Sequence, residues 1–149
     1  MRQLVYALRF RGEARRIGID GNVLKTAAGA SGCTLRARIA ADGLSGSLQP
    51  EFDGEATSES ELVLTGATTF QQAGTIEFGT GGHRLRFSTV GSGHLGSGPE
   101  SDRRYGAAIW QVDGGEGQFA GAVGLIASVI CVGEDLSVVD HQLGVLFVS

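Results

Sequence analysis

The sequence predicts an all-β protein, built as a sandwich or a barrel. Strand-like runs recur about nine times, separated by turns about every 8 to 14 residues, and no segment has convincing helical periodicity. The chain holds 25 glycines but only 2 prolines, a composition that favours strands with many turns and bulges. Both ends of the chain read as strands, and pairing them would close a barrel and remove its exposed edges.

Length, net charge and cysteine content limit the number of domains, the partners and the disulfides that can be expected. At 149 residues the chain is expected to form one domain over residues 1–149. The net charge of −4 gives no electrostatic footprint for nucleic acid, so no such partner is expected. No signal peptide or membrane-spanning segment is recognisable, and we expect a cytoplasmic protein without membrane contact. Cys33 and Cys131 each lie in an apolar run, which favours two buried thiols over a disulfide.

In the first half of the chain, alternating apolar and polar residues predict short strands joined by polar turns. Arg15 and Arg16 are expected in a connecting segment, residues 29–32 at a strand end, and the acidic residues 53–60 in a loop. Asp42 and Gly43 form a hairpin signal. The predicted strands cover residues 3–11, 22–28, 33–39, 44–52 and 61–65.

Residues 70–78 and 83–89 form a hairpin whose register follows from the sequence. The four residues 79–82 make its loop, and a slip by one residue would place Arg84 and Arg86 on the core face. An opposite-charge pair and an aromatic ring over a bare glycine also favour this register. The predicted partners are Phe78 with His83, Glu77 with Arg84, Ile76 with Leu85 and Gly74 with Phe87.

A glycine-rich stretch, residues 114–124, lies between two strand-like runs at 105–112 and 125–132. Five of its residues are glycine, and they surround one large apolar side chain, Phe119. The stretch predicts a tight corner whose phenylalanine closes one end of the core. A nucleotide-binding loop is the alternative, but the following residues read as a strand rather than the helix such a loop requires.

The rest of the second half contains one ambiguous stretch and a final strand. Residues 91–99 are a glycine-bent strand end or a surface loop, and residues 100–104 are expected in solvent. The last strand is expected over residues 136–148.

Around the glycine-rich corner the sequence resembles the allene oxide cyclase and dirigent-like barrel group. The likeness covers about twenty residues, from Trp110 to Ser128, and Val123 stands where that group carries an arginine. The resemblance implies an eight-stranded, antiparallel, calycin-like barrel. It also implies a homodimer or homotrimer and a cavity that holds an apolar small molecule without a cofactor. The matching residues are Gly115, Gly117, Phe119, Gly121, Ala122 and Gly124.

Polar groups on an otherwise apolar inner face are the candidates for function, because a small barrel has room for one ligand at most. His83 and Tyr105 are the candidate catalytic residues, with His83 as a general base. A rim histidine bonded to water is the alternative for His83, and small residues beside Tyr105 suit a neighbouring strand equally well. The candidate ligand-binding residues are Gln72, Phe78, Phe87, Thr89, Trp110 and His141.

Two questions about these candidates stay open in the sequence. His141 and the pair Asp140 and Gln142 lie on opposite faces of the last strand, and the alternation does not say which face is inside. A buried, hydrogen-bonded amide is an alternative role for Gln72. The three histidines have no metal-ligand spacing, so no metal site is predicted, and no nucleophile elbow supports a serine hydrolase.

Three functions remain as hypotheses. The first is a cofactor-independent enzyme that isomerises, cyclises or hydrates an apolar small molecule. The second is a non-catalytic, lipocalin-like binder of similar ligands, and the third is a packed structural barrel. A desolvated acid–base pair in a cavity would favour the first, an apolar cavity without one the second, and an interior filled by side chains the third.

Overall fold

A computed structural model describes the chain over residues 1–149, with the side chains of all residues except 52 and 53. It confirms the all-β prediction: the chain is almost entirely antiparallel strand, with a single 3₁₀ turn at Gly117–Phe119, η1, among the residues described. The strands are β1 (Arg2–Ile17), β2 (Val23–Ala40), β3 (Gly43–Leu64), β4 (Thr69–Phe78), β5 (His83–Thr89), β6 (Gly93–Ser97), β7 (Arg103–Glu116), β8 (Val123–Gly133) and β9 (Ser137–Val148).

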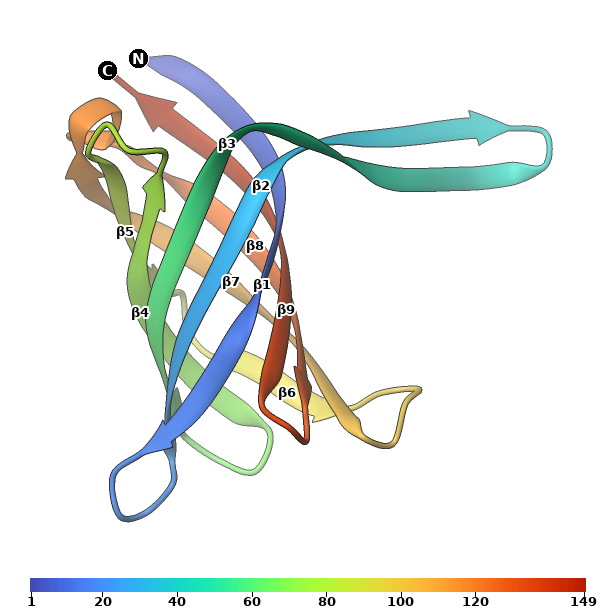
Figure 1. Ribbon diagram of the computed structural model, residues 1–149, viewed down its shortest axis with the longest axis vertical. Coiled ribbons are helices and arrows are strands. Elements are labelled where there is room, and N and C mark those ends of the chain that lie inside the picture. The colour runs from blue at the N-terminus through green and yellow to red at the C-terminus, as the bar shows by residue number, and fades with distance from the viewer.

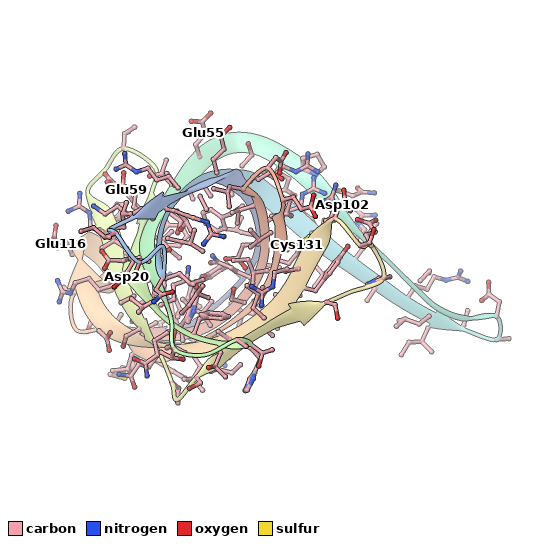
Figure 2. The ribbon with its side chains drawn as sticks, turned by 90° about the horizontal axis from the view of Figure 1, so that it is seen from below. Asp20, Glu55, Glu59, Asp102, Glu116 and Cys131 are labelled. Atoms are coloured by element: carbon pink, nitrogen blue, oxygen red, sulfur yellow. The ribbon has the colours of Figure 1, made fainter. Side chains whose placement is uncertain are left out.

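The nine strands form one sheet that closes on itself. Its order is β3-β2-β1-β9-β8-β7-β5-β4-β6, and additional pairings join β3 to β4 and β7 to β6. The short strands β5 and β6 both bridge β4 and β7, one at each end of the sheet. The strands therefore run around a core of side chains, as the view along the sheet shows (Figure 2).

The two ends of the chain pair as the sequence predicts. β1 lies antiparallel to β9, with Arg2 opposite Val148 and Glu13 opposite Ser137. Both termini therefore lie at the same end of the sheet, beside η1 (Figure 1).

Side chains alternate between the core and the outside along each strand. This period of two is most regular in β9, where Val138, Asp140, Gln142, Leu146 and Val148 are buried. The structure therefore decides the open question about the last strand: Asp140 and Gln142 face inward, and His141 faces outward. Aromatic and branched side chains fill the core, among them Phe10, Leu62, Phe70, Ile76, Leu85, Phe87, Trp110, Ile126 and Leu146.

The predicted β4–β5 hairpin has the register read from the sequence. All four expected pairs are present, from Phe78 with His83 to Gly74 with Phe87. The Arg84 guanidinium donates a 3.1 Å hydrogen bond to the Glu77 carboxylate. Because both side chains are more than one-third exposed, this ion pair contributes little to the free energy of unfolding.

The glycine-rich corner also forms as predicted. It joins β7 to β8 through η1, and Phe119 is 1% exposed beneath it. The Phe119 ring lies against Phe78, with a centroid separation of 5.2 Å. The segment that follows the corner is β8 rather than a helix, so the corner lacks the element that a nucleotide-binding loop requires.

Several predicted boundaries are wrong because the strands are longer than the sequence suggests. Arg15 and Arg16 belong to β1, and residues 29–32 lie inside β2 rather than at its end. Residues 53–60, predicted as a loop, continue β3, and part of the ambiguous stretch 91–99 forms β6.

β2 and β3 extend beyond the closed sheet as a two-stranded ribbon, residues 33–50, which we call the arm. It projects away from the body at the end that carries the termini (Figure 1). The arm leaves the body at a bulge between Ser31 and Cys33, and its strands are joined at Ala40 and Gly43 by the predicted turn.

Among the residues described, no helix has the length and apolar character needed to cross a lipid bilayer.

Candidate functional site

A cavity of about 500 Å³ lies at the end of the sheet that carries both termini, and we call it the mouth cavity. Four structural features form its walls: the N-terminal half of β1, the root of the arm, the end of β4 and the glycine-rich corner. Most of the side chains that reach it are apolar. Its lining includes Leu4, Tyr6, Leu8, Cys33, Phe78 and Phe119.

The mouth cavity exists because β1 loses one neighbour there. β1 pairs with β9 along residues 2–13 but with β2 only along residues 11–17. Beyond that point β2 bends away at the bulge and enters the arm. The Cys33 thiol donates a 2.8 Å hydrogen bond to the Ala7 carbonyl, which ties the root of the arm to β1 across the gap.

A chain of four hydrogen-bonded side chains runs from the mouth cavity into the core. The Tyr6 hydroxyl donates to Oε1 of Gln142 at 3.1 Å, and Nε2 of Gln142 donates to Oδ2 of Asp140 at 2.8 Å. The Ser128 hydroxyl donates to the other carboxylate oxygen of Asp140 at 2.6 Å. Tyr6 is the only member that lines the mouth cavity, while the other three are almost fully buried.

Strand register explains why these side chains meet. Ser128 of β8 lies directly opposite Gln142 of β9, and Asp140 lies two residues along the same inner face. Tyr6 of β1 lies opposite Gly144, which has no side chain to displace the tyrosine ring. The ring therefore covers Gly144, and its hydroxyl reaches Gln142 on the same face of β9.

We expect Gly144→Ala to disturb this arrangement. A methyl group at residue 144 would lie 2.2 Å from Cε1 of Tyr6, so the ring must move away from Gln142. Such overpacking lowers the free energy of unfolding by about 1–3 kcal/mol. The matched control is Gly96→Ala, whose methyl group meets no atom within 4 Å. Urea unfolding of both variants measures the difference, and equal stabilities would contradict the placement of Tyr6.

Burial dominates the electrostatics of this chain of side chains. Desolvation raises the pKa of Asp140 above its ordinary value, although the hydrogen bonds from Ser128 and Gln142 partly oppose the rise. Burial, and secondly the charge of Asp140, raise the pKa of Tyr6. Tyr6 therefore keeps its proton at physiological pH and presents a hydrogen-bond donor beside an apolar cavity.

Two of the predicted ligand-binding residues, Phe87 and Trp110, lie in the middle of the core. Their rings stack with a centroid separation of 4.0 Å and an interplanar angle of 18°. Both are at most 2% exposed. Together with Phe10 and Phe70 they fill the middle of the closed sheet, where a ligand was expected from the sequence.

Gln72 and Thr89, also predicted to bind ligand, are engaged with each other and with neighbouring strands. The Thr89 hydroxyl bonds to both the backbone N–H and the carbonyl of Gln72, each at 2.9 Å. Nε2 of Gln72 donates to the Ser60 hydroxyl at 2.7 Å. Among the described residues, Oε1 of Gln72 and Nε1 of Trp110 are buried without a partner, which leaves one acceptor and one donor inside the sheet.

The structure separates His83 from the other candidate catalytic residue. His83 begins β5 at the rim, where its Nδ1 accepts a 3.1 Å hydrogen bond from the backbone N–H of Gln118. This contact joins the histidine to the glycine-rich corner. Phe78, at the end of β4, lines the mouth cavity and contacts Tyr6 edge to face.

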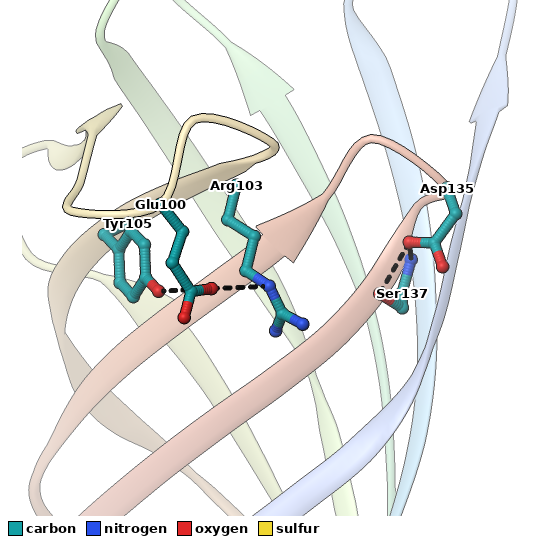
Figure 3. A network of polar contacts seen from close by, with 5 residues as sticks. All are labelled: Glu100, Arg103, Tyr105, Asp135 and Ser137. Carbon is teal, nitrogen blue, oxygen red and sulfur yellow. Dashed lines mark hydrogen bonds and ion pairs between the residues drawn. The ribbon is translucent and has the colours of Figure 1, made fainter.

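Tyr105 and His141 both lie on the outer face of the sheet. The Tyr105 hydroxyl donates to Glu100 at 3.2 Å, and Arg103 donates to the same carboxylate at 2.8 Å (Figure 3). His141 is exposed on β9, where desolvation and the charges of Arg9 and Arg11 lower its pKa. The structure therefore brings neither residue to the mouth cavity.

A second cavity, about 550 Å³, lies on the outer face over β1 to β4. It is larger than the mouth cavity, but its charged residues, such as Glu13, Lys25 and Glu59, are exposed to water. For that reason the mouth cavity, which meets a buried polar chain, is the stronger candidate. Within residues 1–51 and 54–149, no three His, Cys, Asp or Glu side chains are grouped to hold a metal ion. Cys33 and Cys131 are free thiols, each partly buried.

Sequence reasoning missed Tyr6 and Ser128 as site residues. Tyr6 sits in a regular amphipathic strand, and nothing in that pattern marks its hydroxyl as functional. The available signal was the pair Asp140 and Gln142, two polar residues on one face of an otherwise apolar strand. If that face had been chosen as the inner one, the inward residues of the neighbouring strands β1 and β8, which include Tyr6 and Ser128, would have become candidates.

Comparison with known proteins adds no relative: no family model, curated protein or solved structure matches this chain.

Proposed function

We propose that this protein binds an apolar small molecule in the mouth cavity, without a cofactor, and that Tyr6 donates a hydrogen bond to it. The carrying observation is a largely apolar cavity of about 500 Å³ whose wall holds the Tyr6 hydroxyl, which is bonded to the buried Gln142; the Thr34 hydroxyl in the same wall is bonded to the exposed Glu51. That volume falls within the range usual for small-molecule sites, which combine apolar walls with a few placed polar groups. The ligand chemistry that fits is an apolar skeleton with one carbonyl or hydroxyl oxygen.

The proposal includes the finer fold assignment. We regard the closed sheet as an eight-position barrel of the allene oxide cyclase-like group, in which β5 and β6 share one position. The pairings of both short strands with β4 and β7 support this, as does the glycine-rich corner closed by Phe119. A barrel of this size holds little more than its own side chains, which agrees with a ligand at the mouth rather than in the middle.

Tyr6 is suited to the role of a polar anchor. Its hydroxyl can turn from Oε1 of Gln142 to a ligand oxygen while its ring remains over Gly144. Because burial and Asp140 raise its pKa, the phenol stays protonated and acts as a donor. Gln142 and Asp140 then hold the far side of the hydrogen-bonded chain in place.

The test is a binding screen with apolar compounds that differ only by a carbonyl or hydroxyl oxygen, read by native mass spectrometry and thermal shift. Tyr6→Phe should weaken binding of the oxygenated compounds up to about tenfold, the value of one neutral hydrogen bond. Binding of the matched hydrocarbons should not change. If Tyr105→Phe weakens binding and Tyr6→Phe does not, the site lies on the outer face. If no compound binds, the packed structural barrel is the better description.

An isomerase is the second candidate, because two further groups line the same cavity. Glu51 at the root of the arm carries a carboxylate, and Cys33 a thiol. In this scheme Glu51 removes a proton from the carbon beside a carbonyl, Tyr6 stabilises the enolate oxygen, and the proton returns at a different carbon. Deuterium exchange into a bound ketone in heavy water, lost in Glu51→Gln, separates this reaction from simple binding.

A further inference from the structure

The arm carries an apolar face that the chain leaves uncovered. Its cross-strand pairs place Leu35 opposite Leu48 and Ile39 opposite Leu44 on one face, and polar residues on the other. Ile39 is 86% exposed and Leu44 is 77% exposed. A two-stranded ribbon is marginally stable in water unless its apolar face packs on something else. The arm therefore requires a covering surface.

The body carries a second uncovered apolar surface, on the outside of β1, β9, β8 and β7. Across these strands Val5 lies opposite Val145, which lies opposite Leu125, and the row beside it ends at Phe147 and Val123. Contiguous apolar surface of this kind on a monomer marks an interaction site. We call it the outer apolar face; its exposed residues are Val5, Ile109, Val123, Leu125, Val129, Leu143 and Phe147.

The two surfaces meet at the root of the arm and face the same space. Leu35 of the arm and Val5 and Leu143 of the body all line the mouth cavity. Further along the outer face of β1, Leu48 and Pro50 of the arm line a hollow of about 350 Å³ together with Arg9 and Arg11. The apolar face of the arm and the outer apolar face of the body are thus close to each other at the root of the arm. From there the arm projects away from the body (Figure 1).

We propose that the arm of one copy of this chain docks, apolar face down, on the outer apolar face of a second copy, and that the exchange is reciprocal. Each copy has one exposed arm and one exposed outer apolar face. In a reciprocal dimer, each arm covers the outer apolar face of the other copy, so both surfaces are buried. The polar side of the arm, with Arg36 and Arg38, stays in water in this arrangement. This proposal does not depend on the ligand proposed above.

The area of such an exchange comes to the threshold for a biological interface between two copies. A strand of eight residues is about 26 Å long, and a two-stranded ribbon is about 10 Å wide. One docked arm therefore removes about 260 Å² from each of the two surfaces. Two reciprocal junctions bury about 1,000 Å² in total, which reaches the lower limit of specific interfaces before any direct contact between the bodies.

Sedimentation velocity of the full chain over a wide range of concentration tests the proposal. We expect a species of twice the chain mass, and a monomer at every concentration would overturn it. Ile39→Asp on the arm and Leu125→Lys on the outer apolar face should each abolish the dimer; neither residue lines the mouth cavity. Leu44→Asp and Val129→Lys repeat the test at second positions, and circular dichroism shows that each variant is folded.

Mixing the variants distinguishes this arrangement from others. Ile39→Asp and Leu125→Lys chains together should regain a dimer, because one junction is intact and the other brings opposite charges together. No recovery would mean that arms pack on arms or faces on faces, and would overturn the proposal. Ser45→Asp adds the same charge to the polar side of the arm, next to Arg38, and should leave the dimer intact. Loss of the dimer in that control would overturn the assignment of the apolar face.

Discussion

Phe119→Ala is expected to lower the free energy of unfolding by about 3–5 kcal/mol. Phe119 is 1% exposed, and its ring contacts Phe78, which in turn contacts Tyr6. Removing the ring leaves a hole at the end of the core that the corner cannot fill, because Gly115 packs its backbone against β5 there. A loss of this size is a large fraction of the about 5–15 kcal/mol that stabilises a typical domain.

Urea unfolding of Phe119→Ala and Phe119→Leu measures this effect. Leucine keeps most of the apolar volume, so that variant should lose less than about 1.5 kcal/mol. Because Phe119 also lines the mouth cavity, the alanine variant should bind larger ligands than the wild type. If both variants unfold like the wild type, the glycine-rich corner does not depend on Phe119, and the comparison with the barrel group loses its structural basis.

Where neighbouring strands are joined by a short loop, the sequence alone determined the pairing. Glu77 with Arg84 and Gly74 with Phe87 could be paired by hand because a one-residue slip would bury two arginines. The corner was recognisable for a similar reason, since five glycines around a single Phe119 have few other uses. Both features depend on residues close together in the chain.

Strand length was harder to predict, because small polar residues hide the alternation. In the second half of β3 the inward positions include Ala56, Ser58 and Ser60, while Glu55 and Glu59 point outward. A stretch of serines and glutamates reads as a loop, although its period of two is intact. Buried Ser60 is hydrogen-bonded to Thr26 and Gln72 on the two neighbouring strands, β2 and β4. Those partners are distant in sequence.

The candidate site could not be located from periodicity because β9 is apolar on both faces. Val139, Leu143 and Phe147 on its outer face resemble a core stripe as much as Val138 and Leu146 do. The outer face is apolar, in our proposal, because a second copy covers it. Apolar residues on both faces therefore removed the contrast that normally identifies the inner face, and both His141 and Asp140 remained candidates.

The second large effect is expected at Asp140. Asp140→Ala removes the acceptor for Ser128 and Gln142 and leaves two buried donors unpaired. At about 1–3 kcal/mol for each of the two unpaired groups, the variant should lose about 2–6 kcal/mol of stability. Asp140→Asn keeps the shape and can still accept one hydrogen bond, so it should lose much less.

The pH dependence of stability separates the charge of Asp140 from its shape. Because burial raises the folded-state pKa of Asp140, the folded protein holds this proton more tightly than the unfolded chain. The contribution of protonated Asp140 to stability is therefore complete below its pKa in the unfolded chain. It is lost as pH rises through its pKa in the folded protein. Wild type should thus lose stability relative to Asp140→Asn as pH rises from acid to neutral.

Asp135 provides a control of opposite sign. It accepts hydrogen bonds from the hydroxyl and the backbone N–H of Ser137 (Figure 3), and these lower its pKa. Its contribution is present above the unfolded pKa and is lost as pH falls, so wild type should gain stability relative to Asp135→Asn over the same rise in pH. Urea unfolding of the three proteins across this range gives both differences. If the Asp140 difference is flat or has the sign of Asp135, Asp140 is not a desolvated carboxylate, and the hydrogen-bonded chain behind Tyr6 must be reassigned.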